Sequence, residues 1–153
     1  MLIVGGGWLI ILPLLLLILE QRTLSLRGMP WLIIGAAIFT SGIILGLMAG
    51  YYLISRGRGT PFPLDPTHEL VTSGPYGYVR NPQAIAMVLA VTGEIIAVES
   101  HIVWLMLPLT LAYLLILTGP WEERQLTAQH GEHYLAYKRR IRNWVPSFEH
   151  YEE

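Results

Sequence analysis

The chain of 153 residues contains no cysteine, so disulfide bonds, thiolate nucleophiles, cysteine-ligated zinc and iron–sulfur clusters are excluded. Charged residues are also scarce, at 14% of the chain, whereas soluble domains carry about 25%. The net charge of −1 offers no general basic surface for a nucleic acid. Any chemistry must therefore come from a few oxygen, nitrogen and aromatic groups.

Apolar residues, by contrast, make up 53% of the chain and gather in four runs: 2–19, 31–54, 82–98 and 102–118. The first run has no charged residue and would reach about 27 Å as a helix, close to the hydrocarbon thickness of a bilayer. No basic residue precedes it and no small-residue cleavage site follows, which favours a transmembrane helix over a signal peptide. We predict one all-α integral membrane domain over residues 1–153, with four transmembrane helices, a cytoplasmic loop at 55–81 and a cytoplasmic, amphipathic helical tail at 120–153.

The basic residues predict the orientation of these spans. The loop after the second span and the tail hold eight of them, against only Arg22 and Arg27 on the other side. Cytoplasmic segments retain Lys and Arg, so both termini should be cytoplasmic, in the inner membrane of a bacterium or archaeon. The loop and the tail would then meet at one membrane face.

Within the second run, Gly42, Gly46 and Gly50 repeat every four residues. Such a stripe lets another helix backbone approach closely. The partner could be a second copy of the chain in a homodimer, although such glycines more often pack helices of one chain.

The stretch LVTSGPYGYVRNP, residues 70–82, carries the first dense polar motif. Gly74-Pro75 predicts a tight turn, and Asn81-Pro82 predicts a helix start with Asn as the cap. Arg80 would lie beside the free N–H groups of that helix, a place suited to a carboxylate, phosphate or hydroxyl group. The simpler alternative is a capped helix with an interfacial arginine.

The second polar motif lies in the tail. Trp121, Glu122, Glu123, Leu126 and Gln129 follow helical spacing up to Gly131, a plausible helix end. A second short helix would then place three apolar or aromatic residues on one face (Tyr134, Tyr137 and Ile141) and cations on the other (Lys138, Arg139 and Arg142). The two tail tyrosines alternatively could pack an amphipathic helix onto the bilayer.

These two motifs together resemble the isoprenylcysteine carboxyl methyltransferases and their phospholipid methyltransferase relatives. Shared features are a Gly-Pro-Tyr turn, an Arg-x-Pro helix start, a paired acid and a Gly-x-x-Tyr-x-x-Tyr order before a closing proline; the matching residues are Gly74, Pro75, Tyr76, Arg80, Pro82, Glu122, Glu123, Leu126, Gly131, Tyr134, Tyr137 and Pro146. The resemblance implies S-adenosylmethionine held at the cytoplasmic face and a lipophilic acceptor that enters from the bilayer. Asn81 stands where the family usually has His, and the arginine that precedes the paired acids in the eukaryotic carboxyl methyltransferases has no counterpart at residues 117–121.

The chemistry of methyl transfer assigns roles to these residues. The protein has to position both partners and exclude water, and it needs no nucleophile of its own. We expect Glu122 and Arg80 to be the catalytic residues. We expect the cofactor to contact Tyr76, Tyr78, Arg80, Asn81, Pro82, Glu122, Glu123, Tyr134 and Tyr137, with Arg80 pairing its carboxylate and the rings facing its adenine or sulfonium.

Two other functions fit the same architecture, an NADPH-dependent membrane reductase of the sterol reductase type and a non-catalytic membrane scaffold. The paired acids and the tyrosine motif favour the methyltransferase, whose acceptor could be a lipid amine, an isoprenoid carboxylate or another lipophilic group. We predict no metal site, because His130 and His133 have no evident third ligand. Glu94, within the third span, either marks a functional site or reaches the interface.

Overall fold

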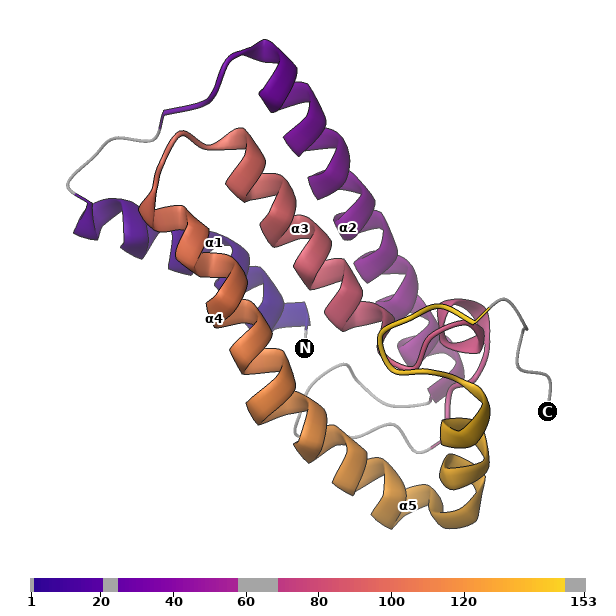
Figure 1. The fold of residues 1–153 in the computed structure, drawn as a ribbon. Helices are drawn as coiled ribbons and strands as arrows, with labels where there is room; N and C mark the ends of the chain where they lie inside the picture. The colour runs from indigo at the N-terminus through magenta and orange to yellow at the C-terminus, as the bar shows by residue number, and fades with distance from the viewer. Residues whose placement is uncertain (1, 21–24, 58–68, 148–153) are drawn as a thin grey trace.

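The computed structural model describes residues 2–20, 25–57 and 69–147, and their regular structure is helical (Figure 1). The main helices are α1 (Leu2–Leu19), α2 (Met29–Gly57), α3 (Pro82–Ala97), α4 (Met106–Ala112) and α5 (Gly119–Arg140). Short turns η1 (Gly74–Gly77), η2 (Ile102–Leu105) and η3 (Tyr113–Thr118) complete the chain. The all-α prediction is confirmed for these residues, and the first three predicted apolar runs agree with α1, α2 and α3 to within three residues at each end.

Two helical runs are long and apolar enough to cross a membrane, Met29–Gly57 and the continuous run Ile102–Arg140, while Gly7–Leu19 and Pro82–Ala97 are shorter apolar helices within the described residues. Their outer surfaces are strongly apolar. Ile10, Ile18, Leu47 and Ile116 are each more than 60% exposed. Such a surface is suited to contact with lipid chains. The predicted loop 55–81 begins later than expected, because α2 continues to Gly57, and residues 58–68 lie outside the described residues.

Helices α2 and α3 lie side by side along their length (Figure 1). Glycines allow this close approach. A Cβ atom on Gly42 would lie only 2.7 Å from the Ala86 carbonyl oxygen and from the Ala90 nitrogen, whereas one on Gly46 would lie 3.5 Å from the Ala86 Cβ. Gly42 and Gly46 therefore face α3 of the same chain, which is the packing alternative for the glycine repeat.

We expect Gly93→Ala to destabilise the protein by about 1–3 kcal/mol, the usual cost of overpacking. An added Cβ would lie 2.5 Å from the Phe39 nitrogen and 2.6 Å from the Gly35 carbonyl oxygen, both backbone atoms that cannot move alone. Chemical unfolding in detergent micelles would measure the change. Gly46→Ala is the matched control because its Cβ would make an ordinary contact; equal stability of the two variants would contradict this packing.

The remaining helices close the bundle around a small apolar core. Leu16 and Leu17 of α1 contact Val91 and Ile95 of α3 and Met106 of α4. The Trp8 Nε1 donates to the Thr110 hydroxyl at 2.8 Å, and its ring stacks on Tyr113 at 4.9 Å. At the Ala97 end of α3, Leu26 and Val98 form an antiparallel bridge. The two short connections are therefore joined at the end of the bundle that lies away from Arg80.

The helical run that begins at Ile102 continues into the polar tail without a break. Turn η3 is π-helical: the Gly119 N–H donates to the Leu114 carbonyl five residues earlier. A Cβ on Gly119 would lie 2.8 Å from that oxygen, so the wide turn favours glycine here. Pro120 follows at the start of α5, where its missing N–H costs little. The helix bends only at Gly131 (φ 52°, ψ −124°), so the predicted boundary between span and tail at residues 118–120 falls within a continuous helical run.

Candidate functional site

The site begins with the loop before α3. Gly74 has a positive φ of 61°, and a Cβ there would overlap the ring of Tyr52. The η1 turn that follows buries Tyr76 and Gly77. The predicted Gly-Pro turn is therefore confirmed, and its glycine is needed both for the backbone angle and for the contact with α2.

Asn81 connects the start of α3 to the start of α5. Its Oδ1 accepts a hydrogen bond from the Ala84 N–H at 3.0 Å, which confirms the predicted cap, and Pro82 begins the helix. Because the oxygen caps the helix, the amide nitrogen is free to donate to Glu122 Oε2 at 3.3 Å. One side chain thus fixes a helix terminus and orients a carboxyl group.

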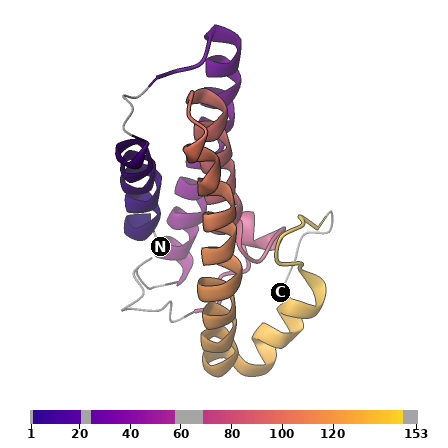
Figure 2. The same cartoon turned by 60° about the vertical axis from the view of Figure 1, so that its left-hand side comes forward.

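After the bend at Gly131, the second part of α5 turns back toward the η1 loop (Figures 1 and 2). Tyr134, Tyr137 and Ile141 are each only 2% exposed and form one cluster, with Leu70 and Leu126 against it. The Tyr137 hydroxyl donates to the Tyr76 carbonyl at 2.5 Å. The predicted face of this short helix is confirmed, and it packs on the site rather than onto a bilayer surface.

The segment after α5 fastens the tail to the same loop through backbone hydrogen bonds. The Arg80 N–H donates to the Arg142 carbonyl at 3.0 Å, and the Ser147 N–H donates to the Tyr78 carbonyl at 2.7 Å. One bond is made by Arg80 itself and the other by Tyr78, two residues earlier, so the two bonds hold the backbone of the arginine in place.

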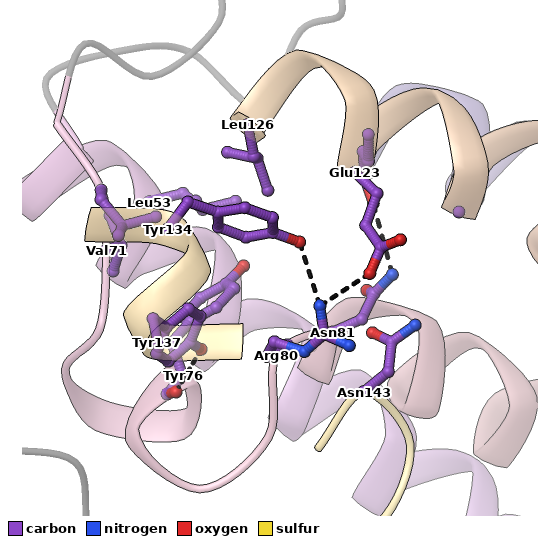
Figure 3. Close-up of a pocket in the computed structure, with 13 residues that line it drawn as sticks. Leu53, Val71, Tyr76, Arg80, Asn81, Glu123, Leu126, Tyr134, Tyr137 and Asn143 are labelled. Carbon is purple, nitrogen blue, oxygen red and sulfur yellow. Dashed lines mark hydrogen bonds and ion pairs between the residues drawn. The ribbon is translucent and has the colours of Figure 1, made fainter. Parts of the chain in front are cut away.

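The Arg80 side chain lies at the centre of the polar network, with 11% of its surface exposed (Figure 3). Its Nη1 donates to Glu123 Oε1 at 2.8 Å and to the Tyr134 hydroxyl at 3.1 Å. Lys138 Nζ approaches the same Glu123 oxygen at 2.9 Å. The Arg80 Nε is buried and has no hydrogen-bond partner among the described residues. An unused donor on a guanidinium in this position is available to a ligand.

The two adjacent acids have opposite electrostatic environments. Burial raises the pKa of Glu122 to about 7. Burial also pushes the pKa of Glu123 upward, but the hydrogen bonds from Arg80 and Lys138 outweigh it and hold that pKa below its ordinary value. Glu123 is therefore an ionised structural partner, whereas Glu122 changes charge near neutral pH, a property common at functional sites.

These side chains line a cavity of about 70 Å³ between the η1 loop, the start of α3 and both parts of α5. Seven of the nine predicted cofactor residues line it: Tyr76, Arg80, Asn81, Glu122, Glu123, Tyr134 and Tyr137. Tyr78 and Pro82 do not; Tyr78 is 45% exposed and Pro82 is buried in the start of α3. Small-molecule sites usually enclose about 300–1,000 Å³, so a cofactor reaches Arg80 and Glu122 only when the surrounding side chains move apart.

Several lining residues were not among the predicted contacts: Leu53, Leu70, Val71, Gly119, Leu126 and Asn143. The apolar ones form a wall next to the charged network. Leu126 belongs to the tail motif and could have been included from its helical spacing with Glu122 and Glu123. Asn143 lies beyond the basic run, and no spacing in the sequence connects it to the site.

The described residues form a helical bundle with an apolar exterior and a polar pocket at one end, which is the layout of a membrane protein with a small-molecule site. The family model for phospholipid methyltransferases matches residues 30–133, more than half of the chain, and the chain belongs to this family. The match contains Arg80, Asn81, Glu122 and Glu123, while Tyr134 and Tyr137 lie just beyond it. Comparisons with curated proteins and with solved structures gave no match. Family membership and the apolar helices together indicate a membrane methyltransferase.

Proposed function

We propose that this protein transfers a methyl group from S-adenosylmethionine to a lipophilic acceptor. The observation that carries the proposal is the pocket in which Arg80, with its unpartnered Nε, lies near the half-buried Glu122 and three tyrosines. The sequence alone predicted this combination of groups, and the fold brings it together from segments more than forty residues apart.

The residues present fit the chemical groups of the cofactor. The unpartnered Arg80 donor suits its carboxylate, and the Glu122 carboxylate suits its ammonium group or its ribose hydroxyls. The rings of Tyr76, Tyr134 and Tyr137 offer faces to adenine or to a sulfonium. When bound, S-adenosylmethionine supplies an electrophilic methyl group that a nucleophilic acceptor can displace.

The residues of the chain then position and shield the reactants. Asn81 holds Glu122 through its amide, and Glu123 neutralises the second side of the Arg80 guanidinium. Glu122, with its pKa near neutrality, can accept a hydrogen bond or a proton from the acceptor. The apolar wall that includes Leu53, Val71 and Leu126 suits a lipophilic acceptor and excludes water from the site.

The charges of the pocket favour a sulfonium cofactor over a nicotinamide dinucleotide phosphate. Among the described residues that line the cavity, Arg80 is the single positively charged one, and it already forms an ion pair with Glu123. A dinucleotide phosphate carries several negative charges and would require more cations around it. Lys138, a further cation beside the site, is itself paired with Glu123.

Calorimetry on the detergent-purified protein tests the proposal. We expect S-adenosylhomocysteine to bind and NADPH to show no comparable heat, because the pocket pairs one cation with two carboxyl groups. The opposite preference would replace the methyltransferase assignment with the reductase, and binding of neither would favour the scaffold.

We also propose the four-span topology with both termini in the cytoplasm, in a bacterial or archaeal inner membrane. Single cysteines at His101 and Val145, both exposed, should react with a membrane-impermeant maleimide from opposite sides of the membrane. The chain has no cysteine, so the parent protein serves as a blank. Reaction of both positions from one side would exclude the arrangement.

A further inference from the structure

A second cavity, of about 260 Å³, lies between α2 and α3 at the end of α3 away from Arg80. Four residues of α2, three of α3 and the cap residue Val98 line it, among them Phe39, Thr40 and Glu94. Glu94 lies twelve residues after Pro82, or about 18 Å along the helix. The groove is therefore separate from the methyl-transfer pocket.

Close backbone packing creates this groove. Gly35 and Gly93 have no side chains, and a Cβ on either would lie within 2.7 Å of backbone on the opposite helix. The backbones of α2 and α3 are in contact at these glycines, and the groove lies beside this contact. Ala36 and Thr40, on its α2 wall, are exposed, so the groove opens to the outside of the bundle rather than into the core.

Glu94 is the acid in this groove and lacks a partner. Its Oε2 is buried and makes no hydrogen bond among the described residues. Arg27, the described cation near this end, donates its Nε to the Val98 carbonyl at 3.2 Å and lies 6.0 Å from the Trp104 ring. Nearby acids are satisfied: Ser100 donates to Glu20 at 2.5 Å and Ser25 donates to Glu99 at 3.3 Å. Leaving one carboxyl oxygen buried beside apolar walls is costly unless something binds it.

We propose that this groove binds a membrane amphiphile with an ammonium headgroup, whose charge pairs with Glu94 and whose chain lies along the apolar walls. Charge complementarity identifies the headgroup: an ammonium satisfies the carboxylate with a short, charge-assisted hydrogen bond, whereas an anionic headgroup would be repelled. Glu94 lies three residues before the end of α3, about 5 Å along the axis, which is a depth near the headgroups. This proposal does not depend on the methyl-transfer function.

Photolabelling of the full-length protein in phosphatidylcholine vesicles tests the site, with a hexadecylamine that carries a diazirine on its chain as the probe. We expect labels on peptides that contain Phe39 or Val98, and we expect excess hexadecylamine, but not hexadecanol, to block them. Glu94→Gln should reduce this labelling about tenfold, the effect of losing one charged contact. Glu99→Gln, an exposed acid at the same end, should leave it unchanged.

A second variant separates loss of the groove from loss of folding. Ala36→Leu fills the groove from an exposed position and leaves Glu94 in place, so it should also reduce labelling while the thermal unfolding of the protein stays the same. Equal labelling of Glu94→Gln and the parent would overturn the proposal. Equal competition by hexadecanol would likewise overturn it, because the groove would then accept any alkyl chain.

Discussion

Glu122→Gln is expected to lower the rate of methyl transfer by about 100-fold or more, which is the usual range for losing a general acid–base group. Glutamine has nearly the same size, so the packing around this half-buried position should survive. It cannot carry a negative charge or take up a proton. Radiolabelled methyl transfer to a lipid extract would measure the loss, with circular dichroism as the test of folding.

The neighbouring acid is the matched control. Glu123→Gln breaks the ion pairs with Arg80 and Lys138, but it leaves Glu122 and its contact with Asn81 in place. We expect it to reduce the rate only about tenfold, through a less ordered Arg80. If Glu122→Gln retained parental activity, or if Glu123→Gln lost more, the roles assigned to the two acids would be wrong.

The same carboxyl group predicts a pH dependence. With a pKa of about 7, Glu122 is mostly protonated at pH 6 and mostly ionised at pH 8. Affinity for S-adenosylhomocysteine should rise about tenfold over that interval and level off above it, and Glu122→Gln should remove the rise. Stability has the opposite sign: between its ordinary pKa of 4.5 and about 7 the folded protein holds a proton that the unfolded chain has released, so this group lowers stability as pH rises through that range.

Arg80→Ala should weaken the binding of S-adenosylhomocysteine by about 100-fold, since truncating one partner of a buried, hydrogen-bonded charge pair costs about 2–5 kcal/mol. The variant also leaves Glu123 and the Tyr134 hydroxyl without their donor. Arg80→Lys keeps the charge but lacks the planar guanidinium fork, so its affinity for S-adenosylhomocysteine should lie between that of the parent protein and that of Arg80→Ala.

Lys138→Met provides the control for the ion pair alone. It removes the other cation that pairs with Glu123. The Lys138 side chain is 41% exposed, and a salt bridge at such a position contributes about 0–1 kcal/mol. Calorimetry should therefore find its affinity within a few-fold of the parent. Binding by Arg80→Ala at parental strength would show that the guanidinium does not contact the ligand.

Much of the fold followed from local rules in the sequence. Apolar runs gave the helix bounds, because a long run without charges has few alternatives to a helix. Asn81-Pro82 predicted a cap that the structure shows, and the two glycines with positive φ lie at the predicted turn (Gly74) and the predicted helix end (Gly131). Each of these signals depends on residues next to one another in the chain.

The division of labour between Glu122 and Glu123 could not be predicted in the same way. Adjacent acids on a helix point in different directions, and which one pairs with Arg80 depends on where Arg80 and Asn81 lie, about forty residues earlier. The packing of Tyr134 and Tyr137 on the η1 loop, rather than on a bilayer, is likewise a tertiary contact. Tyr78 belongs to the motif at residues 70–82, but it does not line the cavity, and its contact with a cofactor stays a prediction.

The π-helical turn at Tyr113–Thr118 changes the helical phase of everything after it. One extra residue in a turn rotates the following residues by about 100°, the angle between neighbours in a 3.6-residue turn. Met106 and Thr110 lie on the buried face before the turn. If the regular helical period continued, the same face would contain Leu117, Trp121 and Arg124, but all three are exposed. Gly119, Glu122 and Leu126 line the pocket instead. A helical wheel drawn through this region must therefore be restarted at Gly119, and a one-residue deletion within the turn would rotate both acids away from Arg80 and Asn81 without shortening any other helix.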